Sequence, residues 1–375
     1  MAPAANKKFR VLIVDDSAFM RKVLEAIFNG DDQLQVAGHA KDGREAVALA
    51  ESLKPDIITM DINMPHMDGL QATAQIMTTN PRPIVIVSSE SKEGAASTLK
   101  ALELGAIEFV AKPSSGIDLD MQSVKEELLR KVRMAAKVRV VRTASRLALS
   151  VQGTNGNPAP AKLSAPARTA PVVPADQRFP VVVLGASTGG PATVMRLAPG
   201  FTRDFPAAVF LVQHMPATFT TQYAAQLAEF TSIRVKEAEN NETVQPGTLY
   251  ICPGAQHLRV TPTGRIQLDS TSGRINGYLP NIDVTMETVA AYAGAMSIGV
   301  VLTGMGNDGA NGAKAIKSAG GIVLAQDEAT SVIFGMPAEA IKLAVVDQVL
   351  AIDDVYAAIE KRVIGICKAS PVGAK

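Results

Sequence analysis

Cysteine is scarce in this chain of 375 residues, which contains only Cys252 and Cys367. The two lie far apart and lack metal-ligand spacing, which argues against a disulfide framework and is typical of a reducing cytosol. Long apolar runs are lacking as well, because none approaches a membrane span and the first ten residues have no signal-peptide core. We therefore expect a cytoplasmic protein without membrane insertion.

The net charge is only +1, but its distribution is uneven. Residues 1–127 hold 13 basic and 19 acidic side chains (−6), residues 128–178 hold 10 and 1 (+9), and residues 179–375 hold 14 and 16 (−2). The middle segment begins as a helix and continues from about Arg142 as a flexible linker interrupted by Pro and Gly. Its charge raises the alternative of nucleic-acid binding. However, its arginines are scattered and aromatic residues are missing, so we expect a solvated linker and no nucleic-acid partner.

Four short apolar runs in the first 112 residues each end on a reactive polar residue. The runs are 9–14, 57–60, 83–87 and 107–111, followed by Asp15 and Asp16, Asp61, Ser88 and Ser89, and Lys112. Such runs suit strands buried on both faces of a parallel sheet, whose carboxyl ends form the site. Clustered carboxylates repel one another, so we expect a divalent cation with oxygen ligands. Strand ends are often polar simply because they meet solvent, but the complete set in a βα pattern favours a site.

These segments resemble a response-regulator receiver domain over residues 8–127. The resemblance lies in Val11–Ser17, Met60–Pro65 with Asp68 and Gly69, Ser88 with Ser89, and Lys112 with Pro113. It implies a five-stranded parallel, flavodoxin-like fold, with Asp61 as phosphoacceptor and a histidine kinase as phosphodonor. It further implies Mg²⁺ bound by Asp15, Asp16, Asp61 and the Asn63 carbonyl, phosphoryl binding by Ser88 and Lys112, and Phe109 as the responding aromatic residue.

The region 179–370 opens on a buried strand that leads into a glycine-rich turn. Phe179–Leu184 runs into Gly185–Pro191, which fits G-x-S-x-G on a strand-turn-helix. A serine at this place, Ser187, lies near a helix N-terminus, where backbone N–H groups favour anionic intermediates. A dinucleotide site is the alternative, but the full G-x-G-x-x-G and its later acidic residue are missing.

Two further strand ends supply candidates for a base and an acid. Ala208–Val212 ends at Gln213 and His214, which places the histidine at the same sheet edge as the serine. Ser297–Leu302 ends in a turn containing Asp308, which either orients the imidazole or merely caps the next helix. His257 precedes an alternating segment that we expect to be an antiparallel hairpin away from the site.

With these segments the chain resembles the protein-glutamate methylesterases, a family of chemotaxis response regulators. The resemblance lies in Gly185–Gly190, Gln213–Pro216 and Thr303–Gly309. It implies Ser187 as nucleophile, His214 as base, Asp308 as orienting acid, the Met305 backbone N–H as oxyanion donor and Thr188 as a neighbouring hydroxyl. The implied domain is doubly wound, mostly parallel α/β with an antiparallel hairpin, and needs no cofactor.

The implied reaction is the hydrolysis of glutamate γ-methyl esters on chemoreceptors with release of methanol. Some family members also deamidate receptor glutamines by the same acyl transfer. The alternative is a non-enzymatic receiver adaptor whose second domain only binds a partner. A flexible linker cannot transmit a rigid motion, so we expect control to come from an interface that covers the Ser187 face.

Overall fold

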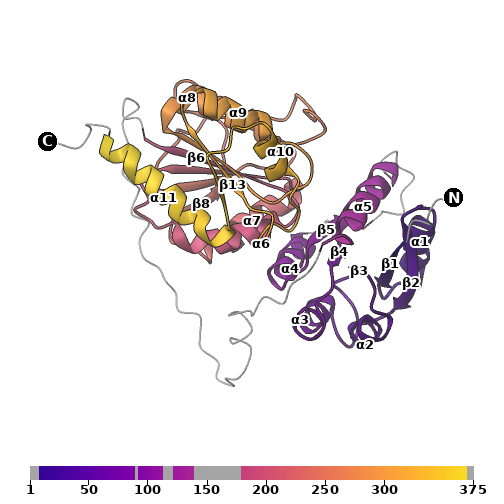
Figure 1. Ribbon diagram of the computed structural model, residues 1–375. Coiled ribbons are helices and arrows are strands. Elements are labelled where there is room, and N and C mark those ends of the chain that lie inside the picture. Colours follow the sequence, from indigo (N-terminus) through magenta and orange to yellow (C-terminus); the bar gives the residue numbers. More distant parts are fainter. Residues whose placement is uncertain (1–7, 89–91, 113–120, 139–178, 370–375) are drawn as a thin grey trace, which may run out of the picture.

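The computed structural model describes residues 8–88, 92–112, 121–138 and 179–369, which form two α/β domains (Figure 1). The expected flexible linker from about Arg142 to Arg178 lies outside the described residues. No helix in the described ranges is long and apolar enough to cross a membrane.

The N-terminal domain is built on a parallel five-stranded sheet in the order β2-β1-β3-β4-β5. Its strands are β1 Phe9–Val14, β2 Leu34–Ala40, β3 Ile57–Met60, β4 Ile84–Ser88 and β5 Glu108–Ala111. Its helices are α1 Ala18–Asn29, α2 Gly43–Leu53, α3 Gly69–Thr79, α4 Lys92–Glu103 and α5 Met121–Ala135. This confirms the five-stranded parallel fold, and α5 continues past residue 127 into the segment that we expected to begin as a helix.

The two faces of this sheet are covered by different helices because side chains alternate along a strand. Val11 and Ile13 of β1 pack in one apolar cluster with residues of α1 and α5. Leu12 and Val14 pack in another with residues of α2, α3 and α4. Helix starts follow local capping, since Ser17, Asp42 and Asp68 accept backbone hydrogen bonds at the first turns of α1, α2 and α3.

The C-terminal domain is doubly wound around a seven-stranded sheet in the order β14-β13-β12-β6-β7-β9-β8. All pairs in this sheet are parallel, and β10 and β11 form a separate antiparallel hairpin. The strands are β6 Val181–Ala186, β7 Ala208–Gln213, β8 Arg234–Glu237, β9 Thr248–Ile251, β10 His257–Val260, β11 Ile266–Asp269, β12 Ser297–Val301, β13 Ile322–Gln326 and β14 Gln348–Leu350. The helices are α6 Gly190–Leu197, α7 Ala217–Ala228, α8 Ile282–Ala293, α9 Ala310–Ser318, α10 Met336–Lys342 and α11 Ile352–Ala369.

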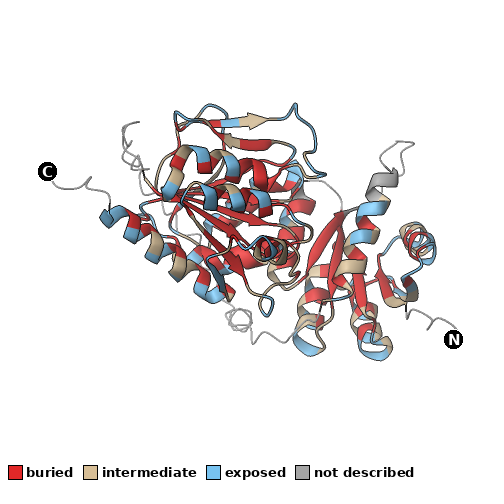
Figure 2. Cartoon of the chain, turned by 45° about the horizontal axis from the view of Figure 1, so that its top comes forward, coloured by how far each residue is buried: buried red, intermediate tan, exposed pale blue. Residues whose placement is uncertain are grey.

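Strands β6, β7 and β12 are buried over their whole length, as continuous apolar runs predict (Figure 2). Val182 and Leu184 face α6, α7 and α11, whereas Val181 and Val183 face α8, α9 and α10. The winding reverses between β6 and β12, so a crevice-forming switch point lies at the carboxyl ends of these two strands.

The two domains pack against each other through helices α4, α6 and α7 (Figure 1). The apolar cluster on the α2–α4 side of the N-terminal sheet continues into the α6, α7 and α11 side of the C-terminal sheet. Phe109 of β5 stacks on Phe219 of α7, with ring centroids 4.4 Å apart.

Candidate functional sites

The carboxyl edge of the N-terminal sheet gathers the acidic residues and the lysine that the sequence singles out. Lys112 Nζ lies 2.9 Å from Asp15 Oδ2 and 2.8 Å from Asp61 Oδ2. Burial raises the pKa of Asp61, while its hydrogen bond with Lys112 opposes that shift. Ser88 is buried at the end of β4, and its carbonyl accepts a 2.8 Å hydrogen bond from the Lys112 backbone N–H. The Lys112 side chain therefore contacts Asp61 directly, and its backbone is tied to the end of β4 at Ser88.

This edge has the ligand chemistry of a divalent-cation site. Asp15, Asp16 and Asp61 each offer a carboxylate oxygen, and these oxygens lie within 4.8 Å of one another. Hard oxygen donors of this kind are the ligands that Mg²⁺ takes in proteins. Asn63 lies in the exposed turn two residues after Asp61. The donor set thus fits the cation that the sequence predicts.

Ser187 lies in the turn between β6 and α6, where it is tied to the neighbouring strand end. Its backbone N–H donates to the Thr303 carbonyl at 3.0 Å, and its carbonyl accepts from Gln213 Nε2 at 2.9 Å. A Cβ at Gly304 would come within 2.8 Å of Ser187 Cβ, so only glycine lets the two turns approach this closely. Ser187 therefore stands at the switch point between β6 and β12.

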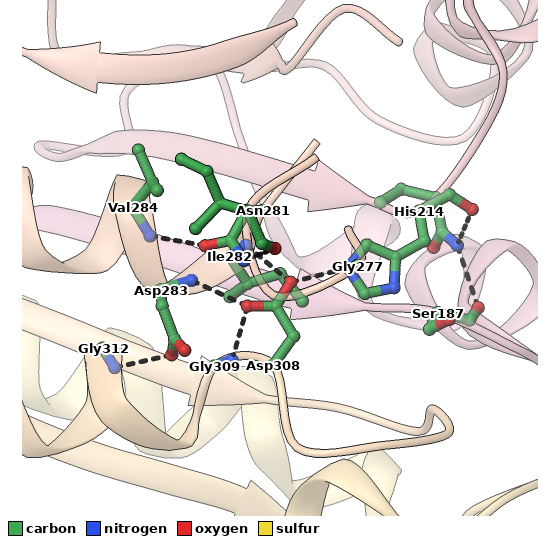
Figure 3. Close-up of polar contacts among 12 residues, drawn as sticks. Ser187, His214, Gly277, Asn281, Ile282, Asp283, Val284, Asp308, Gly309 and Gly312 are labelled. Carbon is green, nitrogen blue, oxygen red and sulfur yellow. Dashed lines mark hydrogen bonds and ion pairs between the residues drawn. The ribbon is translucent and has the colours of Figure 1, made fainter. Parts of the chain in front are cut away.

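His214 and Asp308 meet in a hydrogen bond between His214 Nε2 and Asp308 Oδ2 at 2.7 Å (Figure 3). The remaining ring nitrogen, Nδ1, faces the side on which Ser187 lies (Figure 3). The Asp308 carboxylate also accepts backbone N–H groups of Ile282 at 2.8 Å and Asp283 at 3.0 Å, which belong to the first turn of α8. A carboxylate held this way has a fixed direction, which in turn fixes the imidazole.

The alternative role for Asp308, a cap on the following helix, describes only one of its contacts, the 3.0 Å hydrogen bond that Oδ1 accepts from the Gly309 backbone N–H. Helix α9 begins at Ala310 with Gly309 as its N-cap and without a side-chain cap hydrogen bond. The carboxylate also binds His214 and the backbone at the N-terminus of α8, a separate helix (Figure 3). Helix N-termini favour negative charge, so α8 supports the carboxylate electrostatically.

The remaining predicted residues lie around this centre, except for His257. Thr188 is buried, and its hydroxyl donates a 2.7 Å hydrogen bond to Glu108 Oε2 of the N-terminal domain. Met305 follows Gly304 in the turn after β12, and Arg130 Nη1 of α5 lies 3.1 Å from its sulfur. His257 is fully buried in β10 of the antiparallel hairpin, and its Nε2 lies 2.8 Å from the Gly273 carbonyl oxygen.

Comparison with known proteins agrees with both halves of the chain. Residues 182–359 match the family described as CheB methylesterase, and residues 11–122 match the response regulator receiver domain. The protein-glutamate methylesterase/protein-glutamine glutaminase of Pyrococcus horikoshii is 42% identical over 365 residues, covering 96% of this chain and 95% of that protein. This chain belongs to the protein-glutamate methylesterase/protein-glutamine glutaminase family.

Other family members are similarly close. The protein of the same name from Methanococcus maripaludis is 41% identical over 346 residues, covering 92% of this chain and 94% of that protein. The crystal structure of the Thermotoga maritima CheB methylesterase catalytic domain is 38% identical, covers 49% of this chain and 99% of that one, and has a TM-score of 0.48. Membership in this family confirms the resemblance drawn from the sequence.

The structure adds site residues that the sequence did not suggest. Tyr278 stacks on the His214 ring, with centroids 4.6 Å apart and planes at 16°. Asp283 lies in the first turn of α8, next to the backbone groups that bind Asp308. It is buried, and this burial raises its pKa to about 6. Glu108 and Phe219 contribute to the domain interface. The other site residues were recognisable because each follows an apolar run at the edge of the sheet. These four residues do not, and only the tertiary contacts reveal them.

Proposed function

We propose that this chain hydrolyses glutamate γ-methyl esters on chemoreceptors, releases methanol, and deamidates receptor glutamines, under control of phosphorylation at Asp61. The observation that carries the chemistry is the 2.7 Å bond between His214 and Asp308 at the same sheet edge as Ser187. The names of the relatives support the substrate. Because the substrate is the cytoplasmic part of a receptor, the protein acts in the cytoplasm.

The hydrolase residues divide the acyl transfer into two steps. The Ser187 hydroxyl attacks the ester carbonyl carbon while His214 Nδ1 takes the hydroxyl proton, and Asp308 stabilises the resulting imidazolium through Nε2–H. The Met305 backbone N–H would hold the developing oxyanion, with Thr188 beside the nucleophile. His214 then gives its proton to the departing methoxide, or to the amide nitrogen of a glutamine.

The second step regenerates the enzyme. His214 takes a proton from water, the hydroxide attacks the acyl carbon, and Ser187 leaves as its proton returns, which frees the glutamate. The chain's own residues carry every proton in this scheme, so the proposed hydrolysis needs no cofactor.

In the N-terminal domain, Asp61 would accept the phosphoryl group from a chemotaxis histidine kinase. Asp15 and Asp16, with Asp61 and the Asn63 carbonyl, would hold Mg²⁺, which when bound offsets the negative charge of the phosphoryl oxygens. Lys112 and Ser88 would contact those oxygens directly.

Control follows from what the N-terminal domain touches. Glu108 binds the Thr188 hydroxyl, Arg130 lies against Met305, and Phe109 stacks on Phe219. We propose that the unphosphorylated receiver obstructs receptor entry to Ser187, and that phosphorylation repositions Ser88 and Phe109 and opens this interface. A change of about 2–3 kcal/mol would alter the open fraction by tens to a hundredfold.

The test is methanol release from methylated receptor, with and without a small phosphoryl donor and Mg²⁺. We expect release that the donor stimulates and that Ser187→Ala abolishes. The competing function is a non-enzymatic adaptor, which would release no methanol above the Ser187→Ala background. Such an adaptor would also leave Ser187 unlabelled by an organophosphate.

A further inference from the structure

Tyr278 connects two parts of the hydrolase site that lie on different strand ends. Its ring stacks on His214, with centroids 4.6 Å apart and an interplanar angle of 16°. We propose that Tyr278 is a positioning residue that fixes the His214 imidazole relative to the turn carrying Met305. This inference rests on the proposed hydrolase function.

The hydroxyl end of Tyr278 rests on the turn that follows β12. A Cβ at Gly306 would lie 1.9 Å from Tyr278 Oη, and Gly306 has a φ of +93°, a conformation that favours glycine. Burial raises the pKa of Tyr278, and a hydrogen bond with the Asn307 backbone opposes this. One end of the side chain therefore contacts the turn that carries Met305, while its ring covers the base.

Tyr278 is presented by a tight turn with little freedom. Ile275 and Tyr278 exchange two backbone hydrogen bonds of 3.0 Å each. Between them, Asn276 and Gly277 have φ values of 52° and 88°, as in a type I′ hairpin turn, for which Asn-Gly is the favoured pair. The Asn281 side chain, at the start of α8, donates a 3.1 Å hydrogen bond to the Ile275 carbonyl. The turn is thus anchored to the helix whose N-terminus holds Asp308.

This arrangement leaves the imidazole enclosed on two sides. Asp308 holds Nε2, and the Tyr278 ring covers one face, so the ring cannot rotate without breaking one of these contacts. An aromatic face also attracts the imidazolium that forms when His214 takes the serine proton. Because acyl transfer needs the base and the oxyanion donor within a fraction of an ångström of their places, losing Tyr278 should slow chemistry more than binding.

Two substitutions separate the ring from the hydroxyl. Tyr278→Leu removes both, and Tyr278→Phe keeps the stack. On full-length protein treated with a phosphoryl donor and Mg²⁺, we expect Tyr278→Leu to lower kcat on the order of 30-fold or more at nearly unchanged KM. Tyr278→Phe should recover most of this, to within roughly fivefold of wild type. The rate of Ser187 labelling by an organophosphate should follow kcat.

Tyr292 provides the matched control, because it is another half-buried tyrosine, in α8, whose hydroxyl end lies against Gly264 of the β10–β11 turn. Tyr292→Leu should leave kcat within about twofold of wild type. The inference is overturned if Tyr278→Leu keeps kcat within twofold, if Tyr278→Phe is as slow as Tyr278→Leu, or if Tyr292→Leu is equally slow. Activity retained in Ser187→Ala would instead overturn the hydrolase mechanism itself.

Discussion

Thr188, the residue after the proposed nucleophile, donates a 2.7 Å hydrogen bond to Glu108 of the receiver domain. Both side chains are buried. Glu108 begins β5, the strand that also carries Phe109 and leads directly into Lys112. One short strand therefore connects the phosphoacceptor site with the neighbour of the proposed nucleophile.

We predict that Glu108→Ala activates the unphosphorylated protein. A hydrogen bond to a charged group contributes about 1.5–3 kcal/mol, so its loss should raise basal methanol release by about tenfold or more. Glu103→Ala is the control, because Glu103 accepts a 3.2 Å hydrogen bond from Gln226 Nε2 at the same interface, a contact that does not involve Thr188. Equal basal rates in wild type and Glu108→Ala would exclude a restraining role for this bond.

Removing the receiver altogether should have a larger effect. We expect the fragment from about Arg178 onward to exceed the unphosphorylated full-length protein by tens to a hundredfold in methanol release, and to ignore phosphoryl donors. Phosphorylated full-length protein is the reference for an open site. If the fragment is equal to or slower than the unphosphorylated chain, obstruction is wrong, and the receiver must activate or recruit.

The hydrolase residues make a graded prediction. Ser187→Ala and His214→Ala should each lower kcat on the order of a thousandfold or more while the fold is kept. Asp308→Asn should lose a comparable or smaller factor, because an amide that donates toward Nε2 favours the tautomer with its proton on Nδ1. Measured methanol release above about a tenth of wild type in Ser187→Ala would argue against a serine nucleophile.

Most of the fold and many site positions follow from strand ends, which is why they were predictable. The runs before Asp61, Ser187 and His214 are uniformly buried and carry their polar residue at the edge of a parallel sheet. Strand β2 was missed because Leu34–Ala40 is buried only at its two ends and interrupted by exposed polar residues, so its sequence lacks a continuous run.

What the sequence could not supply is contact between segments distant along the chain. Tyr278 is recognisable only once its turn is seen against His214, 64 residues earlier. Asp283 looks like an ordinary acidic residue in the first turn of a helix, and only its burial beside Asp308 distinguishes it. The contact between Glu108 and Thr188 depends on domain packing, which no local pattern encodes.

The receiver site predicts a strict requirement for Asp61 and for the cation. Asp61→Asn should abolish formation of a base-labile acyl phosphate from a small phosphodonor, and chelation of Mg²⁺ should do the same in wild type. Asp68→Asn is a control, because Asp68 caps α3 by accepting from the Gln71 backbone at 2.7 Å and lies outside the acidic cluster. Undiminished phosphate incorporation in Asp61→Asn would place the acceptor elsewhere.

Asp283 gives a prediction about stability and pH. Its carboxylate is buried behind Asp308 and accepts a 2.7 Å hydrogen bond from the Gly312 backbone N–H, which joins the first turns of α8 and α9. Burial, helped by the charge of Asp308, raises its pKa from 3.8 to about 6. Between these values the folded state binds a proton that the unfolded state releases, so the contribution of Asp283 to stability falls as pH rises.

The size and sign of this effect can be isolated with Asp283→Asn, which does not titrate and still offers an oxygen to Gly312. Relative to the variant, wild type should lose about 2 kcal/mol of unfolding free energy between pH 4 and pH 7, with most of the loss below the folded pKa. Urea unfolding of the hydrolase domain, followed by circular dichroism at several pH values, measures the difference in unfolding free energy between the two proteins, so that other titrating groups cancel.

Asp353→Asn is the control, because it removes one negative charge at an exposed ion pair with Arg196. The difference in unfolding free energy between wild type and this variant should not change with pH. The prediction is wrong if the difference in unfolding free energy between wild type and Asp283→Asn stays constant across this pH range. That result would show that Asp283 is ionised at little cost in free energy. The first turns of α8 and α9 would then stabilise the Asp283 and Asp308 carboxylates together.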